Sequence, residues 1–199
     1  MQLIMSPSSP FVRKVRVLIR EAKLADRVEE VEISTSPMAN DPAAVAANPL
    51  GRIPSLLRND GPAIYDSRVI CRYLDDIADA GLYPESRLYE VLTLEATAEG
   101  MMEAAAGITY EKRFREDRAW PEWLDKQWEK IDRALTATET MWMSHLSGSL
   151  TMAQIAMGCA LGYLDLRHDD RAWRNGRGAL AAWYEDFSQR PGMQDTQPA

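Results

Sequence analysis

The sequence is poor in the residues that build metal and redox centres. Its 199 residues include two cysteines and two histidines. Cys71 and Cys159 each lie in an apolar helical pattern, so we interpret both as small buried hydrophobic residues, not as a disulfide. His145 and His168 have no metal-ligating neighbours at suitable spacing, and we expect them at the surface. No metal site is therefore expected, and this cysteine usage is typical of a reducing compartment.

The sequence also has no long hydrophobic run. No apolar stretch approaches the ~20 residues that span a bilayer, and the chain opens on a strand-like segment, not on a signal peptide. We therefore expect a cytoplasmic protein with no membrane partner. The net charge of -7 argues against nucleic acid as a partner. Residues 1–80 hold ten basic and eleven acidic residues, and residues 81–199 hold thirteen and nineteen, an asymmetry that favours two domains.

Strand and helix patterns alternate over residues 1–79. The expected strands and helices cover residues 2–5, 11–24, 28–33, 42–47, 55–58, 63–65 and 67–78. The turn signal Asn59-Asp60-Gly61-Pro62 joins the last two strands into an antiparallel hairpin. The resulting β-α-β-α-β-β-α order is that of a thioredoxin-like domain.

The second half of the chain shows helical spacing alone. Residues 80–84 are interpreted as a linker, and residues 85–199 as an all-helical domain. Thr151 begins a helix that is apolar nearly all round, with Gln154 at the capping-box position, so we expect it to be the central buried helix. The polar residues after Pro191 are expected to fray.

The segment Asn48-Pro49-Leu50-Gly51-Arg52-Ile53-Pro54 predicts a site for a short peptide. Gly51 permits a tight turn, and Pro54 stands where a cis bond would present the main chain of Ile53 to an extended ligand. Asp66 and Ser67 follow twelve residues later, before a helix. The hydroxyl of Ser67 and the first helical amides can hold a carboxylate, and Asp66 can hold an ammonium. This pairing suits an α-amino acid end group such as the γ-glutamyl end of glutathione.

Four motifs make the chain resemble the bacterial glutathione S-transferases over essentially its whole length. They are Ser-Ser-Pro-Phe-Val-Arg-Lys at 8–14, the segment 48–54, Asp-Ser at 66–67, and Ser-Leu-Thr-Met-Ala-Gln-Ile-Ala at 149–156. The resemblance implies a thioredoxin-like domain that holds glutathione as co-substrate, and a helical domain that shapes the pocket of a small hydrophobic electrophile. It also implies a homodimer and a role in detoxification. The family usually has Asp where this chain has Gln154, but a capping box accepts Gln.

The resemblance assigns the thiolate-stabilising role to Ser9, before Pro10-Phe11 at the start of the first helix. A hydroxyl there can donate a hydrogen bond to the charged sulfur of glutathione. Alternatively Ser9 merely caps the helix, and Ser6 or a backbone amide of the same loop stabilises the thiolate. Arg52 matches a basic residue near the glycine end of glutathione, or is a solvated turn charge. The loop lacks the Cys-X-X-Cys of redox proteins, which disfavours disulfide exchange through a protein thiol. A related glutathione-dependent reaction, such as a reduction that uses two bound glutathiones, is the alternative to conjugation.

The second-substrate pocket and the dimer interface are less well defined by the sequence. Phe11, Met102, Ala106 and Tyr110 are the candidate pocket residues, although core packing explains the same helical spacing. Charges that could pair across a dimer stand on two expected helices, at Arg68 and Arg72 and at Glu95 and Glu99; a solvated face is the alternative. The rivals to a transferase are a non-enzymatic binding or regulatory protein of the same fold and a carrier of apolar ligands.

Overall fold

The computed structural model describes residues 1–198, which form two compact units. Unit 1 consists of Met1–Pro84 together with the tail from Arg190, and unit 2 is Glu85–Gln189. The sequence predicts that the tail is a frayed end of the helical domain. This prediction is wrong, because Met193 and Thr196 are fully buried and the tail belongs to unit 1.

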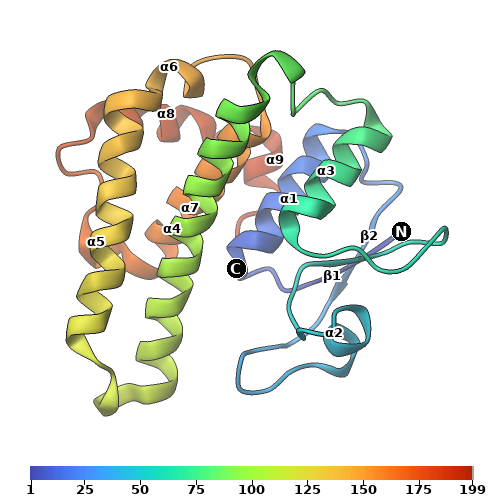
Figure 1. The fold of residues 1–199 in the computed structure, drawn as a ribbon, viewed down its shortest axis with the longest axis horizontal. Helices are drawn as coiled ribbons and strands as arrows, with labels where there is room; N and C mark the ends of the chain where they lie inside the picture. Colours follow the sequence, from blue (N-terminus) through green and yellow to red (C-terminus); the bar gives the residue numbers. More distant parts are fainter. Residues whose placement is uncertain (199) are drawn as a thin grey trace. The chain divides into compact units, whose positions relative to one another are not determined.

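Unit 1 is built on a three-stranded sheet of order β2-β1-β3. Its elements are β1 (Gln2–Met5), α1 (Pro10–Glu21), β2 (Glu29–Glu32), α2 (Pro42–Ala47), β3 (Ser55–Leu57), α3 (Ser67–Ala78) and α9 (Pro191–Gln194). Strand β1 is parallel to β2 and antiparallel to β3. Helices α1 and α3 pack against each other on one face of the sheet, and α2 lies on the other (Figure 1). The predicted thioredoxin-like order is confirmed.

The last strand of the predicted hairpin is reduced to one bridge. Leu56 and Ile64 exchange two backbone hydrogen bonds of 2.9 Å, and no other residue of 63–65 pairs within the described chain. Pro62 has no amide to donate, which stops pairing on one side of the bridge. On the other side the chain turns directly into the cap of α3 at Asp66.

Unit 2 is all-helical, as predicted. Its elements are η1 (Glu85–Arg87), α4 (Leu88–Arg115), η2 (Glu116–Arg118), α5 (Pro121–Ala137), the π-helical turn η3 (Thr138–Trp142), α6 (Met143–Leu146), α7 (Met152–His168), η4 (Asp169–Arg171) and α8 (Gly178–Phe187). All residues from Met152 to Leu164 are buried, so α7 is the central helix expected from its composition, and α4 packs along it. Within residues 1–198 no helix is both long and apolar enough to cross a membrane.

Gln154 forms a capping box at the start of α7. Its Oε1 atom accepts the backbone N–H of Thr151 at 2.9 Å and also the hydroxyl of that residue. Its Nε2 atom donates to the carbonyls of Ser149, at 2.8 Å, and His145, at 3.1 Å. An aspartate has no donor for those two carbonyls. The glutamine therefore both caps the helix and holds the preceding turn.

The two histidines occupy different environments. His168 is 1% exposed, and its Nε2 lies 2.9 Å from the carbonyl of Ala105, so the surface position expected for it was wrong. Burial lowers the pKa of His168, and the hydrogen bond to the Ala105 carbonyl opposes this effect only in part. The net lowering of the pKa keeps the ring neutral at neutral pH. His145 is half-buried beside the ring of Trp142. Within residues 1–198, no three His, Cys, Asp or Glu side chains gather as a metal site would require.

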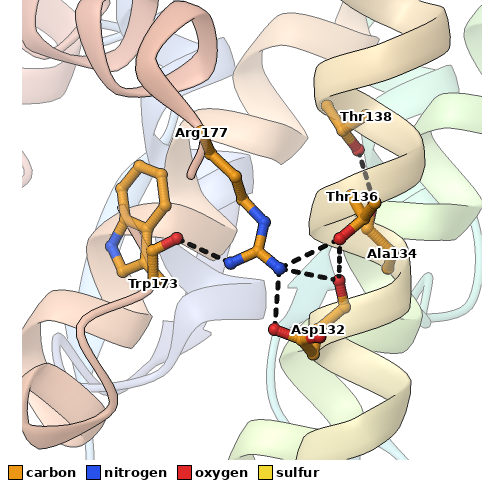
Figure 2. A network of polar contacts seen from close by, with 6 residues as sticks. All are labelled: Asp132, Ala134, Thr136, Thr138, Trp173 and Arg177. Carbon is orange, nitrogen blue, oxygen red and sulfur yellow. Dashed lines mark hydrogen bonds and ion pairs between the residues drawn. The ribbon is translucent and has the colours of Figure 1, made fainter. Parts of the chain in front are cut away.

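Arg177 fastens the segment before α8 to helix α5 (Figure 2). Its Nη1 atom donates to the carbonyl of Trp173 at 2.8 Å. Its Nη2 atom donates to the carboxylate of Asp132 at 2.7 Å and to the hydroxyl of Thr136 at 3.0 Å. The Nε atom is buried and has no hydrogen-bond partner in the described part of the chain. One half-buried arginine thus ties two segments that are more than forty residues apart in the sequence.

Glu139 caps α8 from the neighbouring π-helical turn. Its two carboxylate oxygens accept the backbone N–H groups of Ala179, at 3.1 Å, and Leu180, at 2.7 Å. The residue at the N-cap position, Arg177, makes no side-chain cap of its own. A carboxylate at this end also interacts favourably with the helix dipole.

We expect Glu139→Ala to lower the free energy of unfolding by about 1–2 kcal/mol, because the first amides of α8 lose a charged acceptor. The matched control is Glu129→Ala, which removes an exposed carboxylate paired with Lys126 and Arg133 on the surface of α5. The control should change stability by no more than about 0.5 kcal/mol. Urea unfolding of both variants measures the difference, and equal losses would refute the capping role.

Candidate functional site

Three loops of unit 1 meet at one end of the sheet. Strand β1 runs into the loop Ser6–Ser9, and its residue Ile4 pairs with Ser55 at the start of β3. Because β3 is antiparallel to β1, the residues just before β3 lie at the same end of the sheet as that loop. The bridge to Ile64 is antiparallel as well, so the chain then carries Asp66 and Ser67 back to this end. The topology therefore gathers the predicted glutathione-binding segments.

Ser9 is the N-cap residue of α1. Its Oγ atom accepts the backbone N–H of Val12 at 3.4 Å, a long hydrogen bond, and its carbonyl accepts the N–H of Arg13 at 2.9 Å. The hydroxyl acts as an acceptor in the cap, and no acceptor within residues 1–198 takes its proton. Capping and donation to a ligand are therefore compatible, because they use different parts of one hydroxyl. Ser6, the alternative, lies in the same loop and its carbonyl accepts the N–H of Ser9 at 3.1 Å.

The turn before β3 is held by a buried asparagine. Asn48 is 2% exposed; its Oδ1 accepts the N–H of Leu50 at 2.9 Å and its Nδ2 donates to the carbonyl of Arg52 at 3.2 Å. The hydroxyl of Ser55 donates to the same carbonyl at 3.1 Å. Gly51 has a φ of +62°, and a Cβ there would lie 2.8 Å from the side chain of Asn40. The role of Asn48 was not predicted from the sequence. An Asn side chain that accepts the backbone N–H two residues on forms an Asx turn, and an Asn close before a glycine is a recognisable signal of it.

Ile53 presents an unpaired stretch of backbone. Neither its amide nor its carbonyl is hydrogen-bonded within the described residues, and its peptide bond to the buried Pro54 is cis. Such backbone groups can pair with an extended peptide. The neighbouring side chain of Arg52 is exposed, and it has no hydrogen bond or ion pair with residues 1–198.

Asp66 caps α3 and pairs with Arg68. Its Oδ1 accepts the backbone N–H of Arg68 at 2.9 Å, and its Oδ2 accepts the Nη2 of that side chain at 3.1 Å. Partial burial raises the pKa of Asp66, but hydrogen bonds and charge from Arg68, with the charge of Lys14, outweigh it and lower the pKa overall. An ammonium bound at Asp66 would share a carboxylate that is already engaged. Ser67 is the first residue of α3 and is 3% exposed.

The candidate second-substrate residues differ in exposure. Phe11 is half-buried on α1. Met102 on α4 is fully buried, which favours the core-packing alternative for that residue. Ala106 is half-buried, and Tyr110 is 39% exposed with its ring stacked on Phe114 at 5.8 Å. Along α4, Ala106 and Tyr110 are thus the candidates that reach the surface.

Comparison with known proteins identifies the family. Residues 8–77 match the glutathione S-transferase N-terminal domain, and residues 121–186 match the C-terminal domain. The chain is 30% identical to the uncharacterized GST-like protein YibF of Escherichia coli (strain K12), over 100% of this chain and 98% of that protein. The chain belongs to the glutathione S-transferase superfamily.

Solved structures of relatives carry glutathione. A glutathione transferase family member from Pseudomonas fluorescens Pf-5 with bound glutathione is 43% identical and has a TM-score of 0.97, with coverage of 100% of this chain and 98% of that one. A structure with bound S-(propanoic acid)-glutathione, from the same organism, is 41% identical with a TM-score of 0.92, and both chains are covered in full. The fold expected from the sequence is therefore that of solved family members.

The lowered pKa of Asp66 predicts how its carboxylate contributes to stability. Asp66→Asn keeps a good helix cap and removes the charge. Since the folded-state pKa lies below the ordinary value of 3.8, the stabilisation is present above that value and is lost as the pH falls through the folded-state pKa. We expect the Asn variant to be less stable than the parent at neutral pH, with the difference vanishing in acid. Urea midpoints measured across this range check it, and a pH-independent difference would contradict it.

Proposed function

We propose that the protein is a glutathione transferase that binds glutathione in unit 1 and uses Ser9 to stabilise the thiolate. The observation that carries the proposal is the convergence, at one end of the sheet, of three groups with complementary chemistry. They are the backbone of Ile53, the Asp66-Ser67 pair at the start of α3, and a hydroxyl at the start of α1; neither the Ile53 backbone nor the hydroxyl proton has a partner within residues 1–198.

In the proposed complex each part of glutathione meets one of these groups. The backbone of its cysteine pairs with Ile53 beside Pro54, as an added strand would. The γ-glutamyl carboxylate is held by Ser67 and the first amides of α3, and the ammonium by Asp66. The exposed guanidinium of Arg52 is the proposed partner of the glycine carboxylate.

The chemical task is to keep the glutathione sulfur as a thiolate. A thiol with an unperturbed pKa of about 8.5 is only a few per cent ionised at neutral pH. One hydrogen bond from Ser9 to the charged sulfur supplies about 1.5–3 kcal/mol, which corresponds to about 1–2 pKa units. This leaves the thiolate as a substantial fraction of bound glutathione, ready to attack an electrophile.

The proposed second substrate is a small electrophile. The bound S-(propanoic acid)-glutathione of the Pseudomonas relative is a thioether of glutathione, which supports conjugation of a short carbon chain as the reaction type. Ala106 and Tyr110 of α4 remain the candidate contacts in unit 2, and Phe11 of α1 remains the candidate in unit 1. A non-enzymatic binding protein would hold glutathione through the same backbone and carboxylate groups. It would not require a hydrogen bond from the Ser9 hydroxyl to the thiolate.

We also propose a homodimer, on the family resemblance. The guanidinium of Arg72 lies 4.5 Å from the ring centroid of Tyr83, and its Nη1 atom is buried, so this atom is not available to a partner subunit. Glu95 and Glu99 are 1% and 4% exposed, so the solvated face considered for them is wrong and neither is offered to a partner. Light scattering at micromolar concentration should give a dimer mass, and a monomer mass would exclude the proposal.

Two substitutions should separate binding from chemistry. Asp66→Ala should weaken glutathione affinity about tenfold, because a charge-assisted contact to the ligand ammonium is lost.

Ser9→Ala should leave affinity nearly intact and slow conjugation at neutral pH by about tenfold or more, with the rate recovering as the pH rises through the solution pKa of the thiol. Calorimetry and pH–rate profiles measure the two effects. Superimposable profiles for Ser9→Ala and the parent would assign the thiolate to Ser6 or to a loop amide.

A further inference from the structure

Helix α1 is tied to its surroundings by its own charged residues. Arg16 donates to the carboxylate of Glu30 on β2 at 2.8 Å, and Arg20 pairs with the other oxygen of that carboxylate. Near the far end of the helix, Glu21 accepts both Nε and Nη2 of Arg190 from the tail, at 3.0 and 2.6 Å. These contacts fix the end of α1 that is distant from Ser9.

The tail continues along α1 from this ion pair. A Cβ at Gly192 would lie 3.1 Å from the Glu21 carboxylate and 3.4 Å from the carbonyl of Val17, so the tail backbone lies against the helix with little space. Met193 and Thr196 are fully buried, and the Thr196 hydroxyl donates to the Gly192 carbonyl at 2.8 Å. Figure 1 shows α9 next to α1. The tail is a packed part of unit 1.

Arg13 makes the contact between the tail and the first part of α1. Its side chain is 6% exposed, and its Nη2 donates to the carbonyl of Met193 at 3.1 Å. The Nε atom is buried and has no partner within residues 1–198. Burying a guanidinium that is not paired with a carboxylate costs desolvation free energy, and an apolar residue of similar length would fill the space without that cost. An apolar residue would lack a directional hydrogen bond to the tail.

The same residue is joined to Ser9 through the backbone. The N–H of Arg13 donates to the Ser9 carbonyl at 2.9 Å, the first helical hydrogen bond of α1. Its side chain therefore holds the tail while its main chain holds the residue that carries the proposed catalytic hydroxyl. The cap itself is weak, since the Oγ of Ser9 lies 3.4 Å from the Val12 amide. Ser9 depends on further support from the first turn of the helix.

We propose that Arg13 is a positioning residue that uses the C-terminal tail to set the first turn of α1, and with it the hydroxyl of Ser9. This rests on the proposed role of Ser9 toward the glutathione thiolate. A hydrogen bond to sulfur weakens steeply with angle and distance, so a small displacement of the first turn reduces thiolate stabilisation without removing any group that contacts glutathione. The effect of Arg13 should appear in the pKa of the bound thiol.

The test compares Arg13→Met with Arg177→Met, a matched control from unit 2. Arg13 is buried and Arg177 is half-buried, and each has a buried Nε without a partner in residues 1–198 and a guanidinium that donates to a backbone carbonyl. The pKa of the bound thiol is measured from thiolate absorbance against pH with saturating glutathione, and affinity is measured by calorimetry. Thermal unfolding reports stability for each variant.

We expect Arg13→Met to raise the pKa of the bound thiol by about half a unit or more, and half a unit slows conjugation at neutral pH by about 1.5- to 2.6-fold. Glutathione affinity should change by less than about twofold, because Ile53, Asp66 and Ser67 are untouched. Arg13→Lys keeps a buried donor and should restore part of the shift. Arg177→Met should lower the melting temperature and leave the thiol pKa unchanged. An unchanged pKa in Arg13→Met, or an equal shift in both methionine variants, would overturn the positioning role.

Ser9→Ala in the same experiment distinguishes this inference from the proposed function. If Ser9→Ala shifts the thiol pKa and Arg13→Met does not, the positioning role alone is wrong; if neither shifts it, the role of Ser9 is wrong as well.

If Arg13→Met does not fold, Arg190→Gln provides the test, because it weakens the same tail through a partly exposed ion pair. Amides of the first turn of α1 should then exchange hydrogen faster than in the parent, with a smaller rise of the thiol pKa. Unchanged exchange and an unchanged pKa would refute the role of the tail.

Discussion

The burial of α1 is the constraint on which the rest of unit 1 depends. Eight of its twelve residues are buried, and two of these, Arg13 and Lys14, are basic. A helix buried to this extent cannot shift without breaking contacts on several sides at once, so its N-terminus is a rigid place for a functional hydroxyl. The cost of burying charge is offset by directed contacts: Arg16 and Arg20 bind Glu30, and Arg13 binds the tail. The charged residues of α1 set its position through directed contacts, and its apolar residues stabilise that position by packing.

The candidate glutathione site uses backbone for binding and side chains to shape the backbone. Asn48 and Ser55 hold the Arg52 carbonyl from two sides, and the main-chain groups of the next residue, Ile53, have no partner within residues 1–198. Because this turn is fixed within the chain, a peptide that pairs with it need not order it, and the entropic cost of binding falls. The residues that form this turn are close together in the sequence, so the motif around Gly51 can be recognised from the sequence alone.

Local signals in the sequence were reliable, and long-range partners were not predictable. Helices α2 and α3 begin and end at the residues expected, because Asp41-Pro42 and Asp66 mark their starts by short-range capping. The capping box of Gln154 was found for the same reason. The tail, the burial of His168 and the role of Arg13 were missed. Arg13 and Met193 are 180 residues apart, and no spacing rule connects residues at such a distance.

If Ser9 both caps α1 and donates to the thiolate as proposed, its removal should affect stability and activity to different extents. As a cap, its Oγ contributes through a 3.4 Å contact, so the loss of stability on substitution lies at the low end of the ~0.5–2 kcal/mol measured for helix caps. As a donor to a thiolate, the same hydroxyl is worth about 1.5–3 kcal/mol. The larger contribution thus exists only when a charged acceptor is bound. A binding protein of this fold gains little from the hydroxyl, whereas a transferase gains most of its thiolate from it.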